Sequence, residues 1–241
     1  MKIMDYRFQR TYAELQSSHT VTVQLKRADP IPVFFQQGDI DGACGLYVFA
    51  MVLAIFGLAK ASALEDAPRR KYGVPAEVWA AFQHTYFTGV DHDEYVQLIR
   101  SLDLPLAVAL QCGDTGNIDR FAVECLMRGE LTALAFSSTK NHHTKHWALA
   151  IGIEGRVSGK DTVPDTLLLL DPSAPGPVFS TFNARLRLPS IGKGSRGKTV
   201  NLLKRAGESR KPVHWLYDSP EWPAEPVLLL AAVRFSRAAS T

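Results

Sequence analysis

The sequence predicts an α+β fold, and three observations support this prediction. Apolar patterns with helical spacing dominate the first half of the chain, and β-prone apolar runs dominate the part after residue 130. Helices and strands do not alternate regularly, which argues against a βαβ arrangement. The chain has 241 residues, 46% hydrophobic and 21% charged, so it can bury a large core with little room for disorder.

Four helices are expected from local signals. A glycine-bearing loop leads into the longest apolar run, 46–59. This run is shorter than the ~20 residues that cross a bilayer, so we expect a buried helix. Further helices are expected at 75–83, at 91–102 with Asp91 as the N-cap, and at 118–128, where a glycine follows.

Strands are expected where apolar runs lie between polar turns. Neighbouring runs of this kind are typical of one sheet. The expected strands lie within 20–36, with a break at Asp29-Pro30, and at 104–111, 131–138, 146–155, 166–173 and 226–236.

The charge and the cysteine content limit which partners and which cellular compartment are expected. The net charge is only +3, which argues against a membrane surface or nucleic acid as the partner of the whole chain. Segment 185–211 carries nine Lys or Arg against one Glu, and it is either a solvated face or the site of an anionic partner. Three cysteines are too few for a disulfide framework. With no signal peptide at the N-terminus, we expect a cytoplasmic protein, or one exported by a secretion system without a cleaved signal.

Cys44 stands at a chemically favourable position. It follows a loop with Gly38 and Gly42 and begins the buried helix. Backbone N–H groups at a helix N-terminus stabilise an anion, and the thiolate is the nucleophilic form of cysteine. The simpler interpretation, a small buried packing residue, remains open for this cysteine taken alone.

His146 and Asp171 are the expected partners of Cys44. His146 opens one predicted strand and Asp171 ends the next, 25 residues later, so a hairpin would place the two side by side. A carboxylate in this position would orient the imidazole. Gln37 or Gln36 could donate its side-chain amide to an oxyanion beside the Cys44 backbone N–H.

The segment GACGLYVFAMVLAIFG resembles the nucleophile segment of papain-like cysteine peptidases, and most closely that of the bacterial bacteriocin-processing peptidases that cut after double-glycine leaders. HWALAIGI and LLLLDPS are similar to the His and Asp-Pro segments of that family. The resemblance spans about residues 30–180. It implies Cys44 as the nucleophile, His146 as the general acid and base, and Asp171 as the orienting carboxylate.

The resemblance implies a single papain-like domain, 1–241. Its N-terminal helical half would carry the nucleophile helix, packed on an antiparallel sheet. The catalytic core would lie at about 30–180, with a basic C-terminal extension at about 181–241. The implied function is a cysteine peptidase that hydrolyses a peptide or isopeptide bond in a protein or peptide substrate, without a cofactor.

Three alternatives use the same residues. An acyltransferase or transglutaminase-like enzyme would share the triad and replace water with an amine. A peptidoglycan amidase would share it too, although such an enzyme needs export. A degenerate peptide-binding module would keep the fold without turnover.

Two further motifs and two further cysteines are expected to be non-catalytic. GKGSRGKT, 192–199, matches a phosphate-binding pattern, but too little chain follows it for a nucleotide-binding sheet, which favours a basic loop. His142 and His143 form an H-H-x-x-H cluster with His146, but the first two fall in a polar turn, so no metal site is predicted. Cys112 and Cys125 are expected to pack in or near the core. Trp147 either shields the ion pair or packs in the core.

Overall fold

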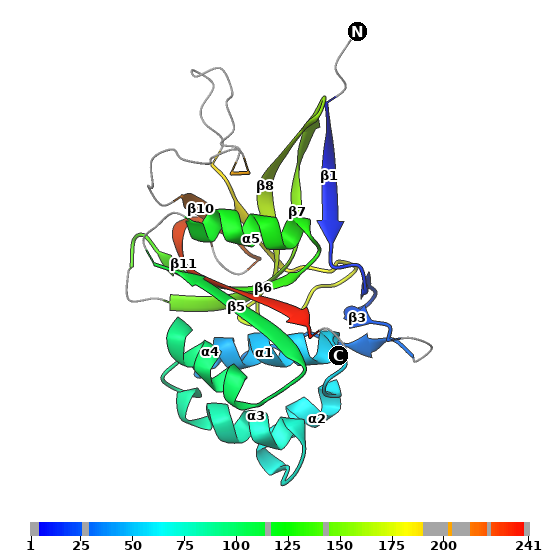
Figure 1. Ribbon diagram of the computed structural model, residues 1–241, viewed down its shortest axis with the longest axis vertical. Coiled ribbons are helices and arrows are strands. Elements are labelled where there is room, and N and C mark those ends of the chain that lie inside the picture. Colours follow the sequence, from blue (N-terminus) through cyan, green and yellow to red (C-terminus); the bar gives the residue numbers. More distant parts are fainter. Residues whose placement is uncertain are drawn as a thin grey trace.

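Six strands of the computed structural model close into a ring, in the order β7–β6–β11–β10–β9–β8, with β8 pairing back to β7 (Figure 1). Every pairing in the ring is antiparallel. The strands of the ring are β6 (Leu131–Ser138), β7 (Lys145–Ser158), β8 (Asp161–Leu170), β9 (Ala184–Arg187), β10 (His214–Asp218) and β11 (Glu225–Arg237).

Two strands extend the ring outward. The first, β1 (Asp5–Thr11), pairs with the outer part of β7, and the second, β5 (Leu106–Cys112), pairs with β11. A separate small sheet is built from three short strands: β2 (Leu15–Ser17), β3 (Val21–Val23) and β4 (Ile31–Pro32). The structure describes residues 5–25, 29–113, 117–141, 145–189, 202–203, 213–220 and 223–238.

Four helices gather on one side of the ring, and a fifth helix lies apart from them (Figure 1). The fifth, α5, contacts β5, β6, β7 and β11. The helices are α1 (Cys44–Ile55), α2 (Ala61–Glu65), α3 (Val74–Phe82), α4 (His92–Ser101) and α5 (Asn117–Met127), with single 3₁₀ turns at Ala67–Arg69 and Gln83–Thr85.

The central helix α1 is almost entirely buried. Ten of its twelve residues lie in the core, which agrees with its uniformly apolar sequence. The helix ends at Ile55, before the apolar run does, because Gly57 adopts a left-handed conformation (φ +69°) just beyond the C-cap. Within the described part of the chain, no helix has the length and apolar character needed to cross a membrane.

Strand β7 separates two apolar cores by the alternation of its side chains. Trp147, Leu149 and Ile151 face a helix-side core, which also contains α1 and parts of α3 and α4. Ala148 and Ala150 face a ring core, to which all six strands of the ring and α5 contribute. The first residues of β7 therefore stand where the two cores meet.

The mixed helix-and-sheet class predicted from the sequence is confirmed. The predicted helices and most predicted strands are present, and the side chain of Asp91 caps α4 by accepting from the backbone N–H groups of Asp93 and Glu94. Four strands were not predicted: β1, β2, β9 and β10. Strand β1 pairs at the outer edge of the sheet and carries mostly polar residues, so it has no strong apolar pattern. Strands β9 to β11 come from the segment interpreted as a C-terminal extension, and they complete the ring.

Candidate active site

Cys44 is the first residue of α1, and its side chain is buried, with the residue 7% exposed. The N-cap residue, Ala43, has no side chain that could accept from the first N–H groups of the helix. The first N–H groups of α1 therefore have no side-chain cap, and a helix N-terminus of this kind favours negative charge beside it.

The loop before Cys44 is held both by its own residues and by Tyr86, whose carbonyl accepts from the backbone N–H of Gly42 at 2.8 Å. Asp41 accepts from the backbone N–H of Gly38 at 2.9 Å and from that of Ala43 at 3.0 Å. Gly42 lies directly on another backbone segment, since a Cβ there would come within 2.8 Å of the Phe87 carbonyl oxygen. The glycine is required by this close approach, which brings the loop against the segment after α3.

His146 and Asp171 lie side by side, as the hairpin prediction required. Strands β7 and β8 pair antiparallel, with Leu149 opposite Leu170, so the start of one strand meets the end of the other. The Nε2 atom of His146 is 2.7 Å from Oδ1 of Asp171. The imidazole is mostly buried and the carboxylate is completely buried.

Asp171 is surrounded by hydrogen-bond donors. Tyr217, on β10, donates its hydroxyl to Oδ2 at 2.6 Å. Ser173 donates its backbone N–H and its hydroxyl to Oδ1, at 2.8 and 2.7 Å. Asn183 accepts from the backbone N–H of Asp171 and donates to its carbonyl oxygen. A buried carboxylate with this many donors stays ionised in a fixed orientation.

The electrostatics of the pair follow from this environment. Burial by itself lowers the pKa of His146, but the charge and hydrogen bond of Asp171, together with Cys44, raise it well above its ordinary value. Burial by itself raises the pKa of Asp171, but His146, Tyr217 and Ser173 together bring it below its ordinary value. Both shifts favour the charged forms of the pair, the imidazolium and the carboxylate.

Cys44 lies close enough to His146 to act on its pKa, and its thiol also points to the Gly42 carbonyl at 3.9 Å. A side-chain hydrogen bond and the negative charge of Cys44 are among the influences that raise the pKa of His146. Because Nε2 is engaged by Asp171, the Nδ1 atom is the one left for the sulfur. The three predicted site residues, from α1, β7 and the end of β8, are thus brought together.

Tyr95, on α4, is a fully buried neighbour of the same thiol. Its hydroxyl has no hydrogen-bond partner among the described residues. Burial, and then the charge of Cys44, raise the pKa of Tyr95 well above its ordinary value. Its ring lies 4.4 Å from that of Trp147, centroid to centroid. Trp147 packs in the helix-side core and donates to the Val90 carbonyl.

The two glutamines proposed for the oxyanion differ in position. Gln36 is exposed and lines an apolar pocket of about 350 Å³ against α1, α2 and α3. Gln37 is partly buried, and its backbone N–H donates to the Pro172 carbonyl, next to Asp171. Its side-chain Nε2 donates to the Asp41 carbonyl at 2.6 Å, on the loop that leads to Cys44.

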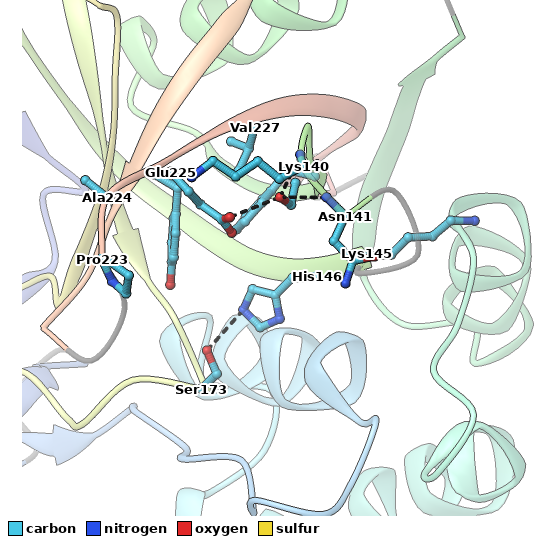
Figure 2. Close-up of a pocket in the computed structure, with 12 residues that line it drawn as sticks. Lys140, Asn141, Lys145, His146, Ser173, Pro223, Ala224, Glu225 and Val227 are labelled. Carbon is cyan, nitrogen blue, oxygen red and sulfur yellow. Dashed lines mark hydrogen bonds between the residues drawn. The ribbon is translucent and has the colours of Figure 1, made fainter.

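A pocket of about 420 Å³ opens beside His146 at one mouth of the ring. In Figure 2, Ser173 lies on one side of the imidazole, and Lys140, Glu225 and Val227 lie on the other. The carboxylate of Glu225 accepts from the Ser138 hydroxyl at 3.0 Å. The lining combines these polar groups with the aromatic rings of Phe136 and Tyr217.

The remaining predictions have separate outcomes. His142, His143 and the GKGSRGKT segment fall outside the described residues, as does most of the basic segment 185–211. Cys125 packs in the core as expected; burial raises the pKa of its thiol to about 11. Cys112 is partly buried and packs against the helix-side core, as expected.

Sequence reasoning missed four residues around the triad. Ser173 had a usable signal, because a serine two residues after an aspartate often closes a turn on that carboxylate. Tyr217 and Tyr95 had none, since each reaches the site from a distant part of the chain, and Asn183, twelve residues after Asp171, belongs to no recognisable motif.

Comparison with known proteins gives no match, either to a family model or to a curated sequence.

Proposed function

We propose that this chain is a cysteine peptidase that hydrolyses a peptide or isopeptide bond, with a papain-like arrangement of its helices and sheet. The observation that carries the proposal is the buried His146–Asp171 pair, 2.7 Å apart, beside a thiol at the N-terminus of a buried helix. Covalent acyl transfer requires a nucleophile, a base beside it, and a third group that orients the base.

The reaction begins at the sulfur. The Cys44 thiolate, stabilised by the helix N-terminus and by the His146 imidazolium, attacks the substrate carbonyl and forms a tetrahedral intermediate. Its oxyanion would accept hydrogen bonds from the backbone N–H of Cys44 and from the side-chain amide of Gln37. Position favours Gln37 over Gln36, because Gln37 is tied both to the loop before Cys44 and to the segment after Asp171.

His146 completes both halves of the reaction. It gives its proton to the leaving amine as the C–N bond breaks, leaving an acyl group on Cys44. It then takes a proton from water, which attacks the thioester and releases the acid. Asp171 holds the ring throughout, and Tyr217 and Ser173 hold Asp171.

The two pockets suggest how substrate is divided. The pocket beside His146 would receive the leaving group, because the general acid must reach the departing amine. The apolar pocket that Gln36 lines extends to Leu46 and Tyr47, just after the nucleophile. It would receive an apolar side chain on the acyl side.

The test is covalent labelling with a peptide-based electrophile, such as a peptidyl vinyl sulfone, followed by mass spectrometry. We expect one adduct on Cys44, no adduct in Cys44→Ala, and full labelling in Cys125→Ala as a matched control. His146→Gln should slow labelling by about 10²-fold or more. Labelling independent of Cys44 or His146 would contradict the proposal.

Turnover separates the alternatives that share the triad. Incubation with a peptide library, with and without an added primary amine, should give hydrolysed products that Cys44→Ala does not form. Amide products formed in preference to acids would instead indicate an acyltransferase. Tight peptide binding without any product would indicate a degenerate binding module.

A further inference from the structure

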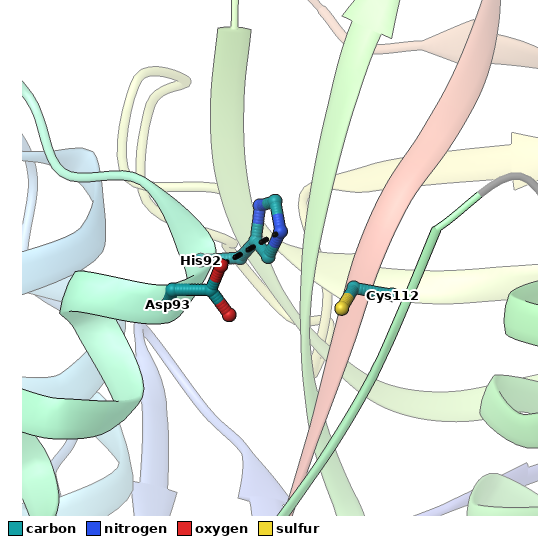
Figure 3. A group of neighbouring side chains, drawn as sticks. All are labelled: His92, Asp93 and Cys112. Carbon is teal, nitrogen blue, oxygen red and sulfur yellow. Dashed lines mark ion pairs between the residues drawn. The ribbon is translucent and has the colours of Figure 1, made fainter.

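A second cluster of reactive side chains lies outside the triad. His92 and Asp93 are the first two residues of α4, and Cys112 is the last residue of β5. Their potential ligand atoms all lie within 4.8 Å of one another, and Nε2 of His92 is 3.7 Å from Oδ2 of Asp93. Figure 3 shows the thiol of Cys112 directed towards the two side chains of α4.

The distances between these ligand atoms are close to those found around a bound metal ion. Ligands about 2.0–2.3 Å from a tetrahedral ion lie roughly 3.3–3.6 Å from one another. The His92–Asp93 separation is already near this value, and the thiol lies within 4.8 Å of both ligand atoms. All three residues are at least partly exposed, so an ion can enter from solvent.

The donor set selects the kind of ion. A thiolate with an imidazole and a carboxylate suits Zn²⁺ and its analogue Co²⁺, whereas Ca²⁺ and Mg²⁺ prefer oxygen ligands alone. The thiolate and carboxylate charges together balance a divalent ion. On binding, the Cys112 thiol releases its proton to solvent as the metal–sulfur bond forms.

The surrounding charge does not oppose the ion. A helix N-terminus is unfavourable for a cation, but the Asp91 carboxylate already accepts from the N–H groups of Asp93 and Glu94. Asp91, Asp93 and Glu94 make this end of α4 acidic.

We propose that His92, Asp93 and Cys112 bind one zinc ion, with water as the fourth ligand, and that the ion links α4 to β5. The ion would therefore help to fix α4 beside the nucleophile. Tyr95 on α4 and Val90 just before it both pack around Gly45 and Trp147, next to Cys44. The site uses none of the triad residues and does not depend on the proposed reaction.

The test uses Co²⁺ as a spectroscopic probe in Cys44→Ser protein, so that the active-site thiol cannot contribute. A thiolate ligand produces a sulfur-to-cobalt charge-transfer band in the near ultraviolet. We expect this band at one Co²⁺ per chain. It should disappear when Cys112→Ser is added and persist when Cys125→Ser is added.

Zinc competition then tests the α4 ligands. His92→Ala should weaken Zn²⁺ binding by at least about tenfold. His84→Ala is the matched control, because His84 lies nearby and pairs with Glu94 but is not in the cluster. Zn²⁺ should raise the melting temperature of Cys44→Ser protein and not that of the doubly substituted Cys44→Ser, Cys112→Ser protein. Absence of the cobalt band, or its persistence without Cys112, would overturn the proposal.

Discussion

The two sides of the candidate site are built in different ways. The nucleophile side is a continuous stretch of chain, in which Asp41 accepts from the N–H groups of Gly38 and Ala43, while the N–H of Gly42 donates to the Tyr86 carbonyl. The acid–base side is assembled from four segments, with His146 from β7, Asp171 from the end of β8, Asn183 from the segment before β9 and Tyr217 from β10.

The two sides should therefore respond differently to substitutions. A local loop depends on the space that its backbone occupies, so steric changes should disturb it most. An assembled network of buried charges depends on each partner being present, so the loss of one group should change the ionisation of the others. Four substitutions test this comparison.

The largest effect is expected from Asp171→Asn. Without the carboxylate charge, burial dominates and the pKa of His146 falls, so the imidazole becomes neutral at neutral pH. We expect turnover to fall by about 10²-fold or more and the alkaline limb of the pH–rate profile to move to lower pH. An alkaline limb that stays in place would show that Asp171 does not control His146.

Gly42→Ala tests the nucleophile side. The added Cβ would lie 2.8 Å from the Phe87 carbonyl oxygen, and this backbone atom cannot rotate away. Overpacking of this kind costs about 1–3 kcal/mol and should displace Cys44 from His146. The free energy of unfolding, measured by urea denaturation, and the rate of Cys44 labelling should both fall. An unchanged labelling rate would separate the loop from the chemistry.

Tyr217→Phe tests whether the network is electrostatically coupled. It leaves one oxygen of the buried Asp171 without its donor, which costs about 1–3 kcal/mol at neutral pH.

The dependence on pH has a defined sign. Because the folded-state pKa of Asp171 is lowered, its contribution to stability is full above the unfolded-state value of about 3.9 and is lost as the pH falls through the folded-state value. The deficit of Tyr217→Phe should therefore shrink in acid. Chemical denaturation at neutral and acid pH measures this, with exposed Tyr6→Phe as the control. A deficit independent of pH would indicate packing alone.

The smallest effect is expected from Tyr95→Phe. Removing a buried hydroxyl that has no partner among the described residues should leave the free energy of unfolding within about 1 kcal/mol of the original, or raise it. The labelling rate of Cys44 should still fall a few-fold, because the hydroxyl is available to stabilise the thiolate. Exposed Tyr72→Phe is the matched control, and an unchanged labelling rate would assign Tyr95 to packing alone.

Local chemistry made much of this molecule predictable. Asp91 is the N-cap of α4, Gly129 follows the end of α5, and the apolar run after Cys44 forms the buried α1. The hairpin that joins His146 and Asp171 could also be expected, because consecutive strands usually pair.

Other features had no local signature. Strand β1 is mostly polar, and its only apolar alternation is Tyr6 and Phe8, which is too short to predict a strand. The choice between Gln36 and Gln37 depends on which side chain turns towards the loop, which neighbouring positions in a chain cannot reveal.

The class of fold and the buried helix could be predicted from local pattern, and the three residues of the candidate triad from their local positions, adjacent strands and a family resemblance. Long-range packing closes the sheet into a ring, places Tyr217 against Asp171, and brings Cys112 to His92 and Asp93. These contacts join residues far apart in the chain. Their formation depends on the packing of the whole core, which no short segment encodes.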